Sequence, residues 1–223
     1  MVTKTRKTSD QERKERTRQS LLAAAARVFL GTGYHKTVIS DIVAEAGVGQ
    51  GTFYRFFRDK EDVFSTLVDG FIERMLAQFA DMSANLPKNA EEYRAASLAA
   101  TKKLAAIFEE NRELVLFFLR EAPTISPAMA AKLDAMLNRF AALAGFYLQH
   151  AILMGFARHC NTEVVGQALI GIALRLVETW AKGRFATSAL DRVIEEIVDL
   201  AFFGFGDPRM RLTMVPSGEG ENR

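Results

Sequence analysis

The chain has 223 residues, of which 49% are hydrophobic and 25% are charged, and its formal net charge is only +2. This describes an ordinary soluble globular protein, long enough for one large domain or two modest ones. A single cysteine, Cys160, excludes an intrachain disulfide and favours a reducing compartment, which predicts a cytoplasmic protein.

The charge is unevenly distributed along the chain. Residues 1–60 hold 12 of the 29 basic residues but only 6 of the 27 acidic ones, whereas the remainder holds 17 basic and 21 acidic residues. A basic end on a mildly acidic body fits nucleic-acid contact at that end. Residues 1–8 are predicted to be a disordered basic arm, which is either a solvated tail or reaches into a minor groove.

Two short helices are predicted after a longer first helix. Ser9 and Glu12 have capping-box spacing, so the first helix is expected to run from there to about Leu30. Gly47 then separates two segments with helical apolar spacing and supplies a residue that tolerates positive φ. The apolar positions of these segments are Ile39, Ile42, Val43, Val48, Phe53 and Phe56. Two short helices joined by a glycine-containing turn form a helix-turn-helix, whose second helix can lie in a DNA major groove.

The second short helix carries side chains suited to reading DNA. Gln50 and Thr52 can contact base edges, and Tyr54 and Arg55 can contact either phosphates or bases. The three phenylalanines of this segment, Phe53, Phe56 and Phe57, are assigned to the domain core.

From Leu21 to Leu67 the chain resembles the amino-terminal DNA-binding domain of the TetR family of bacterial regulators. The matching positions are Ala25, Phe29, Gly33, Tyr34, Thr37, Asp41, Ile42, Ala46, Gly47, Val48, Gly51, Thr52, Tyr54, Phe57, Lys60 and Glu61. Two positions depart from the family pattern, which usually has Thr or Ser in place of Val38 and Ser in place of Gly49. The phosphate contact expected at Val38 therefore passes to Thr37, and Gly49 is itself a tolerated helix cap.

The resemblance implies an all-α fold of about nine helices. Residues 9–60 are the expected three-helix, helix-turn-helix DNA-binding domain, and residues 61–206 are the expected ligand-binding and dimerisation bundle. Base readout is assigned to Gln50, Thr52 and Arg55. Phosphate contacts are assigned to Thr37, Tyr54 and Lys60, the last because its ammonium lies beside the backbone N–H groups of a helix start.

Cap and break signals divide the body into helices. Starts are predicted at Asp59, Asn89, Ser126-Pro127, Asn161 and Ser188. The apolar segment Leu114 to Leu119 is expected to be buried in a bundle and to be stopped by Pro123. A long helix is then expected to reach roughly Phe156, and the tail, residues 207–223, is predicted to be disordered.

The last two predicted helices are more apolar than one buried face requires. Such wide stripes can serve an internal core on one side and a subunit interface on the other, or both can belong to an internal core. A homodimer through these two helices would hold two helix-turn-helix units about one DNA turn apart, roughly 34–36 Å, to read a palindrome. The family resemblance implies the same dimer.

A small-molecule site in the body is implied mainly by the resemblance. Phenylalanines and methionines there are interleaved with polar groups, an arrangement typical of a hydrophobic effector pocket or of plain core. The candidate pocket residues are Phe108, Phe117, Phe118, Arg120, Tyr147, His150, Arg175 and Glu178. Arg175 has the spacing to pair with Glu178 or to meet a ligand anion, and pairing is the preferred interpretation.

Other chemistry finds little support in the residues. His159 and Cys160 are adjacent and unsuited to a shared metal, and no catalytic constellation or cofactor motif occurs, so neither an enzyme, a metal nor a cofactor is predicted. The uncharged segment 140–157 is interpreted as a bundle helix and not as a membrane span. The predicted function is a ligand-responsive regulator that binds a palindromic operator as a dimer, usually as a repressor. The alternative is a helical lipid or acyl carrier with a basic end that contacts a membrane.

Overall fold

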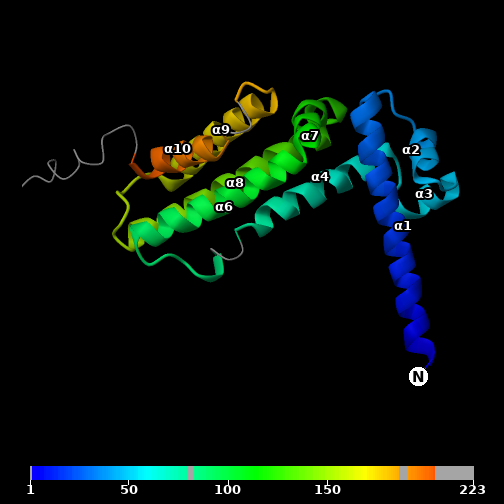
Figure 1. Cartoon of the computed structure of the whole chain (residues 1–223), viewed down its shortest axis with the longest axis horizontal. Helices are drawn as coiled ribbons and strands as arrows, with labels where there is room; N and C mark the ends of the chain where they lie inside the picture. Colours follow the sequence, from blue (N-terminus) through cyan, green and yellow to red (C-terminus); the bar gives the residue numbers. More distant parts are fainter. Residues whose placement is uncertain (1, 80–82, 186–189, 204–223) are drawn as a thin grey trace, which may run out of the picture. The chain divides into compact units, whose positions relative to one another are not determined.

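The structure is a computed structural model that describes residues 2–79, 83–185 and 190–203. Helices, turns and loops account for these residues, with no strand among them, so the predicted all-α fold is confirmed. Figure 1 labels the nine described helices. Their bounds are α1 Val2–Thr32, α2 Ile39–Ala46, α3 Gln50–Phe56, α4 Lys60–Ala77, α6 Ala90–Glu110, α7 Arg112–Ile125, α8 Pro127–Leu153, α9 Thr162–Ala181 and α10 Leu190–Phe203.

Packing divides the chain into two compact units. Unit 1 comprises residues 1–80 and 107–140, and unit 2 comprises residues 81–106 and 141–223. Two helices, α6 and α8, contribute residues to both units. This division follows the packing of the backbone, and the functional boundary near residue 60 stays a prediction.

Helix α1 begins at Val2, seven residues before the predicted start at Ser9, so the residues expected to form a disordered arm continue the helix. Its polar first half is rich in side chains that pair at helical spacing. Glu12 and Arg16 form an ion pair at 3.8 Å, and Gln19 donates to Glu15 at 2.7 Å. Such i,i+4 pairs favour helix in a segment that has no apolar face of its own.

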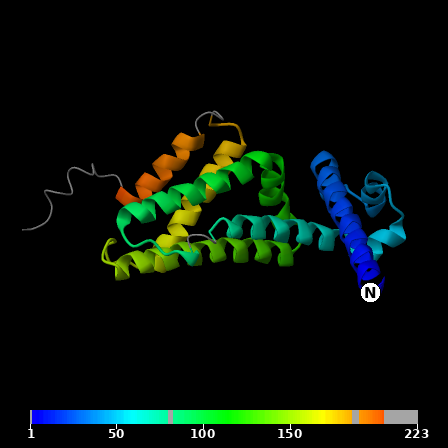
Figure 2. The same cartoon turned by 60° about the horizontal axis from the view of Figure 1, so that its bottom comes forward.

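The core of unit 1 is built where α1 packs against α2, α4 and α7. Figure 2 shows α2 and α3, in blue to cyan, beside the dark-blue α1. Fully buried side chains from three of these helices and from α3 fill the space, among them Leu21, Phe29, Ile42, Phe53 and Phe64. Phe117 and Phe118 of α7 add their rings to Phe64 at centroid distances of 5.8 and 5.4 Å. An aromatic cluster therefore joins α4 to α7.

Pro123 does not stop α7, contrary to the sequence prediction. The helix continues to Ile125 with Pro123 inside it. A proline in the last turn removes one backbone hydrogen bond and leaves the other bonds of the helix intact. The chain turns instead at Ser126, whose extended backbone (φ −162°) is the conformation that a following proline favours. Ser126 accepts from the Met129 amide at 3.2 Å, so the predicted start of α8 is confirmed.

Three other predicted helix starts are also confirmed by their caps. Asp59 accepts from the Asp62 amide at 2.8 Å, and Asn89 accepts from the Glu92 amide at 2.9 Å. Asn161 accepts from two amides of α9, each at 3.1 Å. Each cap satisfies amides that have no partner within the helix, and thereby fixes where the helix begins. The predicted start at Ser188 and the predicted disordered tail, 207–223, lie outside the described residues.

Unit 2 is held by close packing of α8 on α9 and by ion pairs between α6 and α10. A Cβ on Gly166 of α9 would lie 2.4 Å from the Ala141 carbonyl oxygen of α8, so only glycine permits this approach. Arg94 and Lys102 of α6 pair with Asp199 and Glu195 of α10 at 2.6 and 3.4 Å. Helices α9 and α10 also lie side by side in both views (Figures 1 and 2).

The long helix α8 ends at Leu153, three residues before the predicted end. Gly155 has a φ of +80°, and its amide donates to the Ile152 carbonyl at 3.0 Å. A residue in the left-handed region at this point closes a helix, and glycine adopts that region without steric cost.

Candidate nucleic-acid interface

The helix-turn-helix is formed by α2, a tight turn and α3. Gly47 ends α2 in the left-handed conformation, with a φ of 66°, and the Val48 amide donates to the Val43 carbonyl at 3.0 Å. Gly49 then caps α3 in an extended conformation without a side-chain hydrogen bond. The predicted turn glycine is thus confirmed, and the turn folds α3 back so that Phe53 is fully buried.

The outer face of α3 presents the residues expected to read DNA. Gln50, Tyr54 and Arg55 are exposed, Tyr54 to 57%, and Thr52 is half-buried. The Arg55 guanidinium lies 5.1 Å from the centre of the Phe56 ring, which restrains its direction. An exposed helix face with an amide, a hydroxyl, a phenol and a guanidinium can contact bases and phosphates, and the individual contacts stay predictions.

Thr37, predicted to contact phosphate, lies in the domain interior. Its side chain is 1% exposed, and its hydroxyl donates to the Gly33 carbonyl at 2.8 Å and shares a 2.8 Å hydrogen bond with Thr32. The hydroxyl is thus directed inward in this conformation and stabilises the loop between α1 and α2.

Lys60, also predicted to contact phosphate, is engaged within unit 1. Its ammonium donates to the carbonyls of Tyr34 at 2.7 Å and Thr37 at 2.9 Å, and lies 4.3 Å from the centre of the Tyr34 ring. Burial lowers the pKa of Lys60, because a low-dielectric environment disfavours the charged form. Burial also raises the pKa of Tyr34 to about 12, with the carboxylates of Glu61 and Asp59 adding to the effect. Lys60 therefore ties the loop before α2 to the start of α4.

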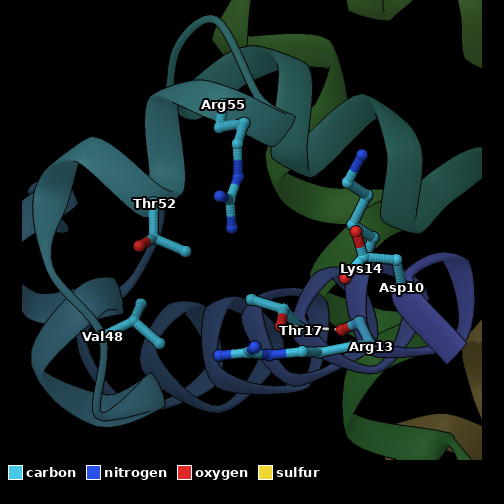
Figure 3. A pocket seen from close by; sticks show the side chains of 7 residues that line it. All are labelled: Asp10, Arg13, Lys14, Thr17, Val48, Thr52 and Arg55. Carbon is cyan, nitrogen blue, oxygen red and sulfur yellow. Dashed lines mark hydrogen bonds between the residues drawn. The ribbon is translucent and has the colours of Figure 1, made fainter. Parts of the chain in front are cut away.

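A groove lies between α1 and α3, next to the exposed face of α3 (Figure 3). It has a volume of about 400 Å³. Asp10, Arg13, Lys14 and Thr17 line it from α1, and Val48, Thr52 and Arg55 line it from the turn and α3. In Figure 3, Thr52 and Arg55 point from α3 into the hollow, while Arg13 lies along the α1 side.

Sequence reasoning included Thr52 and Arg55 but missed Arg13 and Lys14. The signal was present, because residues 10, 13, 14 and 17 follow helical spacing and form one face of α1. Which face of α1 would adjoin α3 depends on tertiary packing, and no apolar stripe in this half of α1 indicates it.

The predicted effector-pocket residues fall into separate groups. Phe108, Phe117, Phe118 and Arg120 belong to unit 1, where the phenylalanines join the aromatic cluster through Phe64 and Phe71. Tyr147 and His150 belong to unit 2. The Tyr147 hydroxyl shares a 2.6 Å hydrogen bond with Ser83, and His150 Nε2 lies 2.8 Å from the Pro87 carbonyl oxygen. Their role in ligand binding stays a prediction.

Arg175 pairs with Glu178 at 3.1 Å on an exposed part of α9, so the preferred interpretation of this pair is confirmed. Glu178 also accepts from Lys182. Hydrogen bonds from Lys182 and then from Arg175 lower the pKa of the Glu178 carboxyl. The three side chains form a surface ion-pair network along one helix.

Among the described helices, one, α9, has the length and apolar composition needed to cross a membrane. In this structure 17% of that segment is buried. One such helix is weak evidence for a span. The exposed residues Val164, Ala168, Gly171 and Ile172 lie at i, i+4, i+7 and i+8, so they form one apolar stripe on its surface.

The chain is similar to known proteins in the helix-turn-helix segment, and the similarity extends beyond that segment. Residues 21–67 match the sequence model of the bacterial regulatory proteins of the tetR family. The HTH-type transcriptional regulator YdgC of Bacillus subtilis is 27% identical over 190 residues, which cover 84% of this chain and 91% of that protein. The fatty acid metabolism regulator protein of Bacillus subtilis is 24% identical, over 72% of this chain and 81% of that protein.

A solved structure shares the fold over most of the chain. The transcriptional regulator FadR from Bacillus subtilis, in complex with stearoyl-CoA, superposes with a TM-score of 0.69 at 22% identity. The alignment covers 84% of this chain and 99% of that chain.

Proposed function

Because the chain belongs to the TetR family of bacterial regulatory proteins, we propose that it is a cytoplasmic regulator of transcription that binds an operator through α3. The observation that carries this proposal is the exposed polar face of α3 on a buried helix-turn-helix core. Gln50, Thr52 and Arg55 contact base edges, and Tyr54 contacts phosphate. Repression is the usual mode of action in this family and is proposed here.

The protein acts as a homodimer through α9 and α10. The apolar stripe on α9 supports this assignment, since Val164 is 62% and Ile172 is 38% exposed in the single chain. A second copy would cover the stripe, and the isologous contact would place two α3 helices to read a palindrome. The stripe is thereby assigned to a partner chain and not to a membrane.

A hydrophobic small molecule releases the protein from DNA. The effector binds preferentially to a dimer whose recognition helices are wrongly spaced, so it shifts the population away from the DNA-bound form. Long-chain acyl compounds are the first class to test. Relatives named for fatty acid metabolism and for a stearoyl-CoA complex support this choice.

The test is fluorescence anisotropy on the labelled DNA fragment upstream of the reading frame, with and without stearoyl-CoA. We expect tight, salt-sensitive binding that the acyl compound reverses. In Gln50→Ala, the preference for particular bases should be relaxed. If stearoyl-CoA leaves DNA binding unchanged, the proposal of an acyl effector is rejected, while the proposal of a DNA-binding regulator stands. Binding to lipid vesicles without any preference among DNA sequences would favour the acyl-carrier alternative.

A further inference from the structure

The groove between α1 and α3 has the charge of an anion site. Arg13, Lys14 and Arg55 line it, against the single carboxylate of Asp10. Two hydroxyl residues, Thr17 and Thr52, complete its polar lining. The groove thus combines three cations with a hollow that is open next to the recognition helix (Figure 3).

These cations are not neutralised within the part of the chain that the structure describes. No carboxylate lies within ion-pair distance of Arg13, Lys14 or Arg55 there. Other arginines of the same segment are paired: Arg16 with Glu12, Arg18 with Glu15, Arg27 with Glu45 and Arg58 with Asp62. Unpaired cations that converge on one hollow leave a local positive potential, which favours a polyanion.

The phosphate contacts first expected at Thr37 and Lys60 involve groups that hold the domain together. Thr37 is 1% exposed, and the Lys60 ammonium donates to two carbonyls of the α1–α2 loop. A helix in the major groove still needs phosphate contacts on its flanks to fix its register. The groove beside α3 supplies cations at that position.

We propose that this groove holds the sugar–phosphate backbone of the DNA beside the major groove that α3 enters. Arg13 and Lys14 bind phosphates from the α1 side, while Arg55 borders the groove on the α3 side and keeps its assignment to base edges. This inference rests on the proposed function for the identity of the duplex and adds α1 as a second DNA-binding element. Because phosphates carry no sequence information, the groove strengthens binding to every duplex equally.

The experiment compares wild type with the double variant Arg13→Ala/Lys14→Ala on two duplexes, the operator fragment and a random sequence, over a range of salt concentrations. Alanine preserves helix, so α1 is retained, and circular dichroism verifies it. Two lost phosphate contacts should lower the slope of log affinity against log salt by about 2 and weaken binding about tenfold or more on both duplexes.

Arg16→Ala is the matched control, since Arg16 lies on the same helix, is 81% exposed and pairs with Glu12. Its removal should change the affinity by less than about twofold, because surface ion pairs contribute little. Asp10→Asn removes the acid from the groove and should tighten binding to both duplexes. If Arg16→Ala loses as much DNA affinity as the double variant, the proposed role of the groove is overturned. The loss would then reflect general charge attraction between protein and DNA.

The outcomes separate the groove from the proposed function. If the double variant binds both duplexes as wild type does, the proposed role of the groove is rejected and the proposed function as a regulator stands. If wild type binds the two duplexes equally while the double variant loses affinity for both, operator recognition is rejected and the groove stands. Absence of wild-type binding to either duplex rejects both.

Discussion

The ammonium group of Lys60 joins the loop before α2 to the start of α4. It donates to the Tyr34 and Thr37 carbonyls and lies over the Tyr34 ring. Lys60→Met should lower the free energy of unfolding by about 1–3 kcal/mol, because the two carbonyls lose a charged donor. Urea denaturation followed by circular dichroism measures the change.

Lys36→Met is the control for this change, since Lys36 is an exposed lysine in the same loop, and its effect should stay within about 0.5 kcal/mol. A Lys60→Met protein with wild-type stability and reduced DNA affinity would contradict the structural role. That result would instead support the contact between Lys60 and a DNA phosphate that was predicted from the sequence.

Tyr93 makes the stability of unit 2 depend on pH in alkaline solution. Its ring packs against Phe156 and Phe202, and burial, with a smaller contribution from Tyr147, raises its pKa to about 12. The unfolded chain ionises near the ordinary value of 10.0 while the folded chain keeps the proton. The contribution of Tyr93 is therefore full below pH 10.0 and is lost as the pH rises toward about 12.

Tyr93→Phe keeps the ring and removes this ionisation. Wild type should lose stability more steeply than the variant as the pH rises from about 10 to 12, with a difference of about 1–2 kcal/mol. Urea titrations at several pH values measure it. Parallel pH profiles for the two proteins would show that the phenol is not protected by burial.

At the scale of elements, the contact between α8 and α9 depends on Gly166. A methyl group there would meet the Ala141 carbonyl oxygen at 2.4 Å, and backbone cannot move aside as a side-chain tip can. Gly166→Ala should lower the free energy of unfolding by about 1–3 kcal/mol through overpacking. Thermal and urea denaturation report the loss.

Gly70→Ala provides the opposite expectation. Gly70 is an exposed residue inside α4, and an added Cβ meets nothing within 4 Å. Alanine should stabilise the helix by about 0.5–1 kcal/mol. Equal effects of the two substitutions would mean that α8 and α9 do not approach as closely as described.

Helix starts could be predicted from the sequence because caps act locally. Asp59, Asn89 and Asn161 each accept from an amide two or three residues later, so short sequence patterns carry the signal. The end of α7 could not be predicted in this way. Pro123 is tolerated in a last turn, and the decisive residue is Ser126, held extended by the proline after it.

The site was predictable only in part, because its two sides are distant in the sequence. The exposed face of α3 follows from the position of its one buried phenylalanine, Phe53. The groove needs the first half of α1 to adjoin α3, a tertiary contact that no local pattern specifies. Thr37 and Lys60 were expected to face DNA, whereas their hydrogen bonds to Gly33, Tyr34 and the loop depend on the folded chain.

At the scale of the whole molecule, operator recognition depends on two copies of the chain. Ile172→Glu places a charge in the exposed stripe of α9 without disturbing the core of the single chain. It should shift the protein from dimer to monomer and weaken binding to a palindrome, while binding to a half-site stays unchanged. Sedimentation and anisotropy measure the two effects.

Ala131→Glu is a suitable control, because Ala131 is an exposed position on α8 within unit 1. It should leave both the oligomeric state and the DNA affinity as in wild type. If Ile172→Glu forms a stable dimer with full DNA affinity, the α9 stripe is not part of the dimer interface.

Selection of bound sequences from random-sequence DNA by the full-length protein tests the central claim most directly, since it assumes no operator position and no effector. The account predicts enrichment of a palindrome whose half-sites lie about 10 base pairs apart, or a multiple of that spacing, as two α3 helices one DNA turn apart require. It also predicts that Gln50→Ala relaxes the preference at particular positions within each half-site. A bound pool without any enriched sequence would contradict operator recognition by this protein.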